Sequence, residues 1–536
     1  MRINRMVVLM LAVGLLLTGS VSLAVAGPPD SITWAYIRDA DGLDPLQWSG
    51  SPSSMVADNI YDTLVEFKRG PDQDTIELQP SLAKSWDISE GGTVYTFYLR
   101  KGVQFHKGWG EMTAEDVKFS FERHMDPDNA SRFRGNVAHI KEVEVLDKYT
   151  VQFTLKNPHP SFLAMSVAYS QGNVLSKDAM AEIGQKEYNT TNPIGTGPYQ
   201  FKNRTFGESL TCVLNEDYWG WEEGQQPEIK EWTMVVIPEE TQAARALLTG
   251  DIDYMAVRTN EAKALLEAAP KGKVLISTNV DLGWAFQNNL DEGKVLGGDA
   301  RLRQALLFAL DRESIVDRVL MGVTEVSSQS PLAPYHGKFY NEDIMSYSYD
   351  PAKAKSLLDE AGYVDINGDG FREAPDGEEI NLEVLTYAQH LPWVIASQNM
   401  WKEVGINSYL NVADYATLYE KVTNRQFDMF TTCMTRPIPA LLWPRYHSEN
   451  VPAPNMMGYR NPHVDKLIET FMSTPETEEE KLVEIAHELQ EIMAEELPVL
   501  RVPGYFTTTA STSKLKGDSY NIGFWAMDFD QMYWED

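Results

Sequence analysis

Apolar residues alternate with polar ones in some segments of the chain and recur every three to four positions in others. Residues 93–100, Thr-Val-Tyr-Thr-Phe-Tyr-Leu-Arg, are rich in aromatic and β-branched side chains, which is typical of a strand. Residues 382–385 predict a second strand. Residues 239–248 are rich in alanine and leucine and precede Gly250, which predicts a helix with a glycine stop. Such segments alternate along the chain, so we expect a mixed α/β protein.

Further helices are predicted from their boundaries. Thr113 with Asp116 three residues later resembles a capping box at a helix start. Asp350 followed by Pro351 marks another start, because aspartate caps a helix and proline suits its first turn. The remaining predicted helices are one long amphipathic helix over 301–320, a helix over 393–404 and a helix over 477–495.

The chain is long and acidic and has the composition of a globular protein. Its 536 residues correspond to roughly three to four domains of common size. Hydrophobic residues make up 43%, with 13 Trp, 24 Tyr and 20 Phe available for a core, which excludes a wholly disordered chain. The formal net charge of −32 would repel phosphate backbones, so we expect no nucleic-acid partner.

The two cysteines, Cys212 and Cys433, are too few for a disulfide scaffold. They lie far apart in the sequence. Either they form one disulfide bond with each other, or both are buried free thiols. Ordinary cysteine burial favours the two thiols.

The first 26 residues have the pattern of a secretory signal peptide. Arg2 and Arg5 precede the apolar residues 7–17, and residues 24–26, Ala-Val-Ala, offer small side chains where a signal peptidase cleaves. The apolar run is too short for a membrane span, which needs about 20 residues. Because no cysteine lies near the cleavage point, we predict a soluble periplasmic protein and not a lipoprotein.

A series of short motifs runs in one order along nearly the whole mature chain. They include Leu43-Asp-Pro45, Leu78-Gln-Pro-Ser-Leu-Ala-Lys-Ser-Trp86, Leu99-Arg-Lys-Gly-Val-Gln-Phe-His106, Ile194-Gly-Thr-Gly-Pro-Tyr199, Asn215-Glu-Asp-Tyr-Trp-Gly220, Gly250-Asp-Ile-Asp253, Ala309-Leu-Asp-Arg-Glu313 and Phe427-Asp428. Together they resemble the signature of the family 5 extracellular solute-binding proteins, which are periplasmic receptors of peptide, oligopeptide and nickel ABC transporters. Each motif is weak alone, whereas all of them in one order are specific.

This resemblance implies a bilobal α/β fold with an additional inserted domain and a ligand cleft between the lobes. Such a receptor encloses its solute when the lobes close about a hinge. The expected limits are 27–61, 192–280 and 501–536 for a discontinuous lobe I, 62–191 for the inserted domain and 281–500 for lobe II.

The resemblance also implies ligand contacts outside lobe II. One group follows the Leu-Asp-Pro motif in a polar loop, a second lies in the inserted domain, and one residue lies in the final crossing between the lobes. For the first two groups, the alternative is that the residues lie on the surface and do not contact a ligand. These candidates are Trp48, Ser49, Ser51, Phe133, Arg134 and Tyr505.

Further candidates lie in lobe II. Trp284 and Phe286 stand where the chain would enter this lobe, and they either wall the pocket or pack the core. His390, with its neighbour Trp393, stands where relatives carry a ligand-contacting histidine, and the alternative is an exposed loop residue. The segment that resembles a strand pairing with a bound peptide backbone comprises Thr432, Cys433, Met434 and Thr435.

One departure from the family pattern bears on the ligand. Peptide-binding relatives carry an aspartate shortly after the Phe-Asp pair, and it neutralises the peptide α-ammonium. Here no acid follows Asp428 through Pro439, and Arg436 lies near the expected place. A peptide-like solute is the family default. Arg436 instead favours an anionic or sugar-like solute, such as an opine or oligosaccharide. The alternative is that Arg436 points to solvent and that another acidic residue neutralises the peptide α-ammonium.

Residues 365–376 resemble a calcium loop. Oxygen-bearing side chains alternate and a glycine stands at the sharp turn, but the twelfth position carries aspartate where glutamate is usual. The same residue types build hairpin turns, which is the interpretation we favour, and any calcium would be structural. The residues of the calcium alternative are Asp365, Asn367, Asp369, Phe371 and Asp376.

We expect a receptor without a cofactor and not an enzyme. Ser81 and Lys84 have the spacing of penicillin-binding enzymes, but the companion motifs are missing. His487-Glu488 lacks a second histidine for a zinc helix. The alternative classes are a periplasmic hydrolase and a periplasmic chaperone. We expect a monomer that binds a small solute and docks on the permease subunits of an ABC transporter in the membrane.

Overall fold

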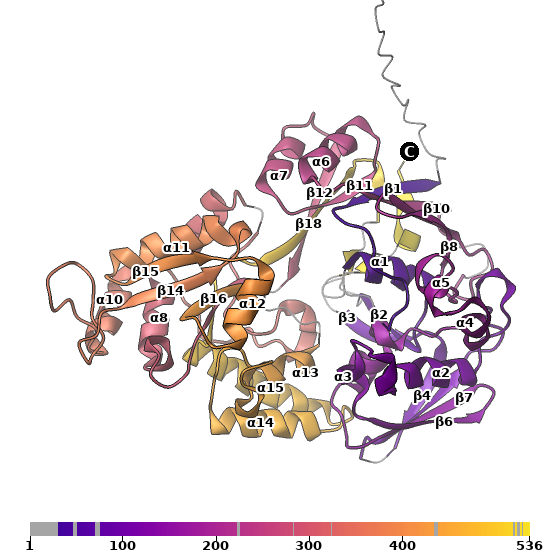
Figure 1. Ribbon diagram of the computed structural model, residues 1–536, viewed down its shortest axis with the longest axis horizontal. Helices are drawn as coiled ribbons and strands as arrows, with labels where there is room; N and C mark the ends of the chain where they lie inside the picture. Colours follow the sequence, from indigo (N-terminus) through magenta and orange to yellow (C-terminus); the bar gives the residue numbers. More distant parts are fainter. Residues whose placement is uncertain are drawn as a thin grey trace, which may run out of the picture.

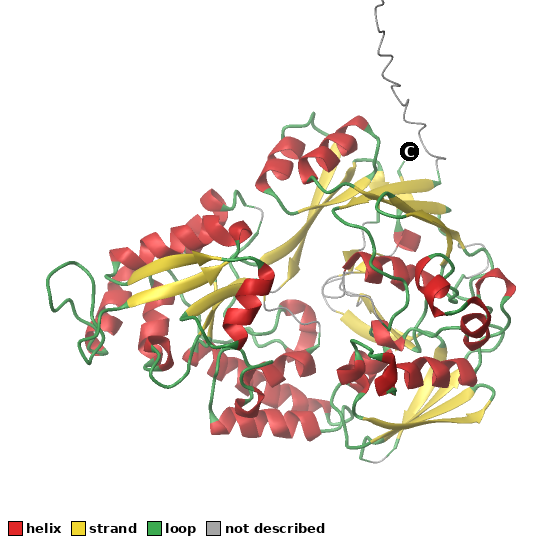
Figure 2. Cartoon of the chain, in the orientation of Figure 1, coloured by secondary structure: helices red, strands yellow, loops and turns green. Residues whose placement is uncertain are grey.

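The chain folds into two lobes, as seen in a computed structural model of the 536 residues (Figure 1). Helices and strands alternate throughout, so the predicted mixed α/β class is confirmed (Figure 2). The predicted signal peptide lies outside the described residues. The structure describes residues 30–46, 51–69, 76–89, 91–221, 226–281, 283–322, 324–433, 438–517, 520–521, 526–527 and 529–535.

A seven-stranded sheet forms the centre of lobe I, in the order β12-β18-β11-β1-β10-β9-β8. β1 is parallel to both of its neighbours, and the remaining pairs are antiparallel. Because β18 comes from the C-terminal part of the chain, both ends of the chain meet in this sheet. The strands are β1 (Ser31–Tyr36), β8 (Tyr199–Thr205), β9 (Ser209–Leu214), β10 (Glu231–Val236), β11 (Tyr254–Val257), β12 (Val274–Asp281) and β18 (Tyr505–Thr512).

Strand β1 shows how the two faces of this sheet are covered. Ile32, Trp34 and Tyr36 point into one core, whereas Ala35 packs into another on the opposite face, as the two-residue period of a strand requires. The first core continues into the inserted domain through Tyr95, so lobe I and the inserted domain pack as one unit. The helices are α1 (Ser51–Ile60) on the first face and α6 (Glu240–Thr249) and α7 (Asn260–Glu267) on the second.

The inserted domain contains a four-stranded antiparallel sheet in the order β4-β5-β7-β6 and a separate hairpin, β2-β3. Thr113 is the N-cap of α2, and its backbone N–H donates to the Asp116 carboxylate at 2.9 Å, which confirms the predicted helix start. The elements are β2 (Val65–Arg69), β3 (Ile76–Pro80), β4 (Ala83–Ile88), β5 (Val94–Leu99), β6 (Ile140–Asp147), β7 (Thr150–Leu155), α2 (Ala114–Met125), α3 (Arg134–Val137), α4 (Lys177–Ile183) and α5 (Gln185–Thr190).

Lobe II is built on a five-stranded sheet in the order β15-β14-β16-β13-β17. β14 runs parallel to β15 and β16, and β13 runs antiparallel to its two neighbours. The strands are β13 (Trp284–Asn288), β14 (Asn381–Thr386), β15 (Asn407–Val412), β16 (Met429–Cys433) and β17 (Val499–Arg501). The helices are α8 (Ala300–Phe308), α9 (Arg312–Ser314), α10 (Pro351–Glu360), α11 (Leu391–Glu403), α12 (Tyr415–Thr423), α13 (Pro439–Leu442), α14 (Pro462–Ser473) and α15 (Glu479–Glu496).

The prediction of one helix over 301–320 is wrong. α8 ends at Phe308, and the Asp311 side chain accepts a hydrogen bond from Ser314 N at 2.9 Å, which starts the new helical turn α9. A π-helical turn over Ile315–Val319 follows. The other predicted helices and strands are present as α6, α11, α15, β5 and β14, with ends that differ by two residues at most.

Within the described residues, no helix combines the length and the apolar character that a bilayer crossing requires.

Candidate ligand-binding site

Two chain crossings between lobe I and lobe II lie in contact with each other. One leads from β12 to β13, and the other from β17 to β18. Gly283 in the first crossing has no room for a side chain, since an added Cβ would lie 2.0 Å from the carbonyl oxygen of Pro503 in the second. The backbone N–H of Val502 donates to the carbonyl of Trp284 at 3.3 Å. The paired crossings form a narrow connection about which we expect the lobes to rotate.

The carboxyl ends of the parallel strands β14 and β16 lie at the edge of the lobe II sheet where the chain enters from lobe I. Trp284, the first residue of β13, pairs with Cys433, the last residue of β16. Thr386 ends β14, and its hydroxyl lies 2.7 Å from that of Thr431. Ligands of α/β proteins commonly bind outside the carboxyl ends of parallel strands. This edge is therefore the candidate lobe II face of the site.

His390 is buried at this edge. Its Nδ1 lies 2.8 Å from Thr431 Oγ1, and its ring centroid is 4.7 Å from that of Trp284 and 5.3 Å from that of Tyr387. Only 2% of His390 is exposed, so it is not the exposed loop residue that the sequence left as an alternative. Burial lowers the pKa of His390 to about 4, which keeps the ring neutral near pH 7. Its Nε2 is buried without a hydrogen-bond partner in the described part of the chain.

Phe286 and Trp393 pack inside lobe II. Both are fully buried, and their ring centroids lie 4.8 Å apart. Phe286 also lies 4.9 Å from Trp401, so it packs the core, which is one of the two alternatives predicted for it. Trp284, two residues earlier on the same face of β13, is half-buried and contacts His390. The aromatic residue at the sheet edge is therefore Trp284.

Phe133 and Arg134 lie at the start of α3, next to the segment that follows the Leu-Asp-Pro motif. The backbone N–H of Arg132 donates to the carbonyl of Leu46 at 3.3 Å. Phe133 is half-buried, with its ring centroid 6.4 Å from that of His124, and Arg134 is exposed. The fold thus brings the start of α3 in the inserted domain close to Leu46, the residue that directly follows the Leu-Asp-Pro motif.

Other predicted contacts stay predictions. The residues that lie outside the described part of the chain are Trp48, Ser49, Met434, Thr435 and Arg436. For Ser51, Cys433 and Tyr505 the structure describes the backbone, in α1, β16 and β18. Thr432 is half-buried in β16, one residue beyond the hydroxyl that contacts His390.

A contact that no sequence pattern indicated joins the inserted domain to lobe II. The Tyr95 hydroxyl of β5 donates to Glu476 Oε1 at 2.7 Å, and the backbone N–H of Leu163 donates to the same oxygen at 3.4 Å. Burial raises the pKa of Glu476 to about 7. Glu476 stands in the loop before α15, and no motif marks it. Only the tertiary fold brings it to Tyr95.

A cavity of about 190 Å³ lies beside this contact. Phe67 and Leu78 of the inserted domain form apolar walls on one side, and Ile438 and Phe471 of lobe II form them on the other. Glu476 also lines the cavity. The cavity therefore belongs to both parts of the molecule.

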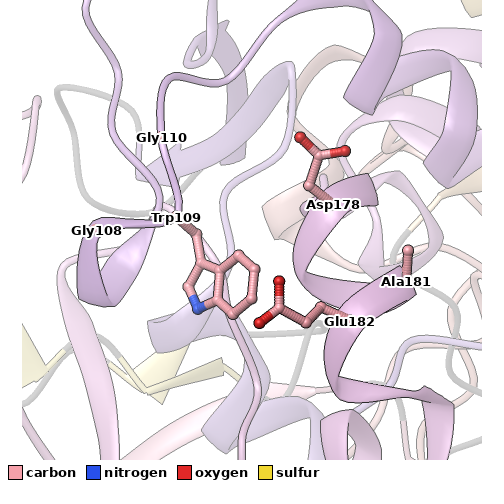
Figure 3. Close-up of a pocket in the computed structure, with 6 residues that line it drawn as sticks. All are labelled: Gly108, Trp109, Gly110, Asp178, Ala181 and Glu182. Carbon is pink, nitrogen blue, oxygen red and sulfur yellow. The ribbon is translucent and has the colours of Figure 1, made fainter.

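An open depression on the surface of the inserted domain is a separate feature. Its lining includes the indole of Trp109 and, from α4, the carboxylates of Asp178 and Glu182 (Figure 3). None of the predicted ligand contacts lines this depression.

The calcium-like loop closes on itself. The Asp365 carboxylate accepts hydrogen bonds from Gly368 N at 2.7 Å and Gly370 N at 3.0 Å, and Asp369 accepts one from Phe371 N at 2.8 Å. Such hydrogen bonds are typical of tight turns. A turn is the interpretation that the sequence favoured for this segment. In the described part of the chain, no group of three or more His, Cys, Asp or Glu residues is placed to hold a metal ion. Calcium binding stays the alternative to the favoured turn, and the absence of a cofactor stays a prediction.

Cys212 is a free thiol buried in β9 of lobe I, and burial raises its pKa well above the usual range. Cys433 lies in β16 of the lobe II sheet. The two residues thus belong to different sheets.

Residues 77–448 match the family described as bacterial extracellular solute-binding proteins, family 5. This chain belongs to that family. Over 375 residues, the solute-binding protein is 32% identical to the dipeptide-binding protein of Escherichia coli, with 66% of this chain and 67% of the relative covered. It is 30% identical over 429 residues to the oligopeptide-binding protein AppA of Bacillus subtilis, with 77% and 76% covered. It is 28% identical over 493 residues to heme-binding protein A of Haemophilus influenzae, with 87% and 86% covered.

The architecture of this solute-binding protein matches the solved structure of AppA in complex with a nonapeptide. The TM-score is 0.72 at 26% sequence identity, and the match covers 94% of this chain and 99% of AppA. The expected bilobal fold is thereby confirmed. The family is one of solute-binding proteins.

Proposed function

We propose that this protein captures a peptide-like solute between lobe I and lobe II in the periplasm and delivers it to the permease subunits of an ABC importer. The observation that carries the proposal is the pair of crossings that touch at Gly283 and Pro503, which join two separate sheets in a chain of the solute-binding family. A solute that contacts both lobes stabilises the closed arrangement, because it binds that arrangement more tightly than the open one.

A peptide-like solute is supported by two of the relatives. Their names describe binding of a dipeptide and of oligopeptides, and the solved structure of AppA holds a nonapeptide. In lobe II, β16 runs to the edge where Trp284 and His390 meet. β16 lies between β14 and β13, but β14 pairs only with Met429 and Phe430. An extended peptide that continued this pairing beyond Phe430 would gain backbone hydrogen bonds, as in other cases of strand addition.

The proposed contacts come from both lobes. Lobe II would contribute Trp284, His390 and Thr432, and lobe I would contribute the loop at Trp48 and the crossing at Tyr505. We further propose that the protein acts as a monomer and that the predicted signal peptide directs it to the periplasm. Closure would present both lobes together to the permease.

Mass spectrometry of small molecules released by unfolding the purified protein tests this function. One equivalent of a peptide-like compound supports it. The same compound, added to solute-free protein, should bind one-to-one in calorimetry and raise the melting temperature. One equivalent of a different class of solute would contradict the peptide-like assignment. Turnover of an ester or amide substrate, without binding of any intact solute, would contradict the receptor function.

A further inference from the structure

The cavity between the inserted domain and lobe II contains a carboxylate, that of Glu476, which has no counter-ion among the described residues. Oε1 of Glu476 accepts hydrogen bonds from Tyr95 and Leu163, whereas Oε2 accepts none from any residue in the described ranges. Within those ranges no Lys, Arg or His forms an ion pair with Glu476. Glu479, which also lines the cavity, is by contrast neutralised by Lys338. The cavity thus offers one negative group that none of the described residues around it neutralises.

The remaining walls suit an apolar group of limited size. Phe67 and Leu78 enter from the inserted domain, and Ile438, Phe471 and Leu482 enter from lobe II. An apolar cavity of about 150 Å³ is large enough for benzene, so the volume of about 190 Å³ accepts one compact organic group of that kind. A carboxylate in such a wall has lost part of its hydration, and a cation bound beside it would restore the lost interaction energy.

We propose that this cavity binds an organic ammonium group with a compact apolar body, with the ammonium against Glu476 and the body against Phe67, Leu78 and Ile438. An ammonium ion donates charge-assisted hydrogen bonds to a carboxylate, and these are stronger than neutral ones. Because the inserted domain and lobe II both line the cavity, the bound group also links the two parts.

Protonation of Glu476 would compete with the ammonium. Burial raises the pKa of this carboxyl to about 7, so the charged form predominates only above that pH. The affinity for a cation should therefore rise between pH 6 and pH 8. The other titratable groups around the cavity, within the part of the chain that the structure describes, are Tyr95, Tyr335, His336, Glu479 and its partner Lys338.

Benzylamine and benzyl alcohol are matched probes, because they have the same apolar body and differ in charge. In calorimetric titrations of the full chain near pH 8, benzylamine should bind with a dissociation constant in the millimolar range, about tenfold or more tighter than benzyl alcohol. Glu476→Gln keeps an acceptor for Tyr95 and removes the charge. It should weaken benzylamine about tenfold and change benzyl alcohol less than about twofold.

Two further variants locate the binding. Glu480→Gln neutralises an exposed carboxylate of α15 and should change neither affinity. Ala164→Leu places a larger side chain at the cavity wall and should abolish binding of both probes. Melting curves verify that each variant is folded. Equal affinity of the intact protein for the two probes would overturn the proposal, as would unchanged benzylamine affinity in Glu476→Gln or in Ala164→Leu.

The outcome is separable from that of the proposed function. If an intact solute is released from the purified protein but benzylamine does not bind, the receptor function stands and the ammonium site is overturned. If benzylamine binds in the manner that depends on Glu476, but no solute is released or bound, the ammonium site stands and the receptor function is overturned.

Discussion

The hydroxyl of Tyr95 donates a hydrogen bond of 2.7 Å to Glu476 across the boundary between the inserted domain and lobe II. The connection through the crossings at Gly283 and Pro503 is therefore supplemented by this non-covalent contact. In Figure 1, β12 and β18 lie in the upper part of the view, whereas α14 and α15 lie at the bottom beside the inserted domain. Rotation about the crossings would move lobe II relative to the inserted domain, so opening must break the Tyr95–Glu476 hydrogen bond.

Replacing Tyr95 should weaken this contact. Tyr95→Phe removes the donor and leaves Glu476 with one longer hydrogen bond, which should cost about 1–3 kcal/mol of stability because the acceptor is charged or partly charged. A lower melting temperature would report the loss. Tyr98→Phe is the matched control on the same strand, since Tyr98 donates to Asp87 in an exposed pair, and it should have little effect. Equal losses in the two variants would contradict the structural account of the contact.

The titration of Glu476 should make the stability of the protein depend on pH. Its folded-state pKa is raised by burial to about 7 from an ordinary value of 4.5, so the folded state binds more protons than the unfolded state between these values. The contribution of Glu476 to stability is therefore present at low pH and is lost as the pH rises towards 7. Glu476→Gln should raise the melting temperature near pH 8 relative to the unmodified protein, and should not raise it near pH 5.

The control for this pH dependence is Glu480→Gln, which alters an exposed carboxylate of the same helix. Its melting temperature should follow that of the unmodified protein at both pH values. A Glu476→Gln effect that is the same near pH 5 and pH 8 would show that Glu476 does not titrate in this range.

The contact between the two crossings should not tolerate a side chain at residue 283. Gly283→Ala would place a Cβ 2.0 Å from Pro503 O, so the crossings must separate, at a cost of about 1–3 kcal/mol. The melting temperature should fall, and solute affinity should fall with it because closure depends on this connection. Gly298→Ala is the control, since the nearest atom to its added Cβ lies at 3.6 Å. If the two variants behave alike, the close approach of the crossings is not a constraint.

The hydroxyl of Thr431 should be needed to hold His390 at the sheet edge. Thr431→Val removes the group that contacts both His390 Nδ1 and Thr386, and leaves buried polar atoms without that partner. We expect a loss of about 1–3 kcal/mol, measured by thermal unfolding. Thr205→Val, at the exposed end of β8, should change stability by less than about 0.5 kcal/mol. A smaller effect at Thr431 than at Thr205 would contradict the buried network.

Local signals predicted much of the secondary structure, because a helix start depends on a few neighbouring residues. Thr113 and Asp116 cap α2, and Asp350 caps α10 with its side chain on Lys353 N. The wrong prediction of one continuous helix over 301–320 also has a local cause. The apolar period continues across Asp311, while its side chain caps a new turn.

The site could be predicted only in part, because burial depth and distant pairing are properties of the tertiary fold. Trp284 and Phe286 share a face of β13, yet only the residue at the strand end stays near the surface. The burial of His390 depends on Trp284, which precedes it by about a hundred positions. The Tyr95–Glu476 contact joins residues 381 positions apart, and neither residue belongs to a pattern that indicates such a contact.

Small-angle X-ray scattering of the solute-free protein, before and after addition of the compound released from it, tests most directly whether two lobes close on a solute. The account predicts a smaller radius of gyration once the compound saturates the protein. Identical scattering curves at saturation, with one-to-one binding verified by calorimetry, would contradict it.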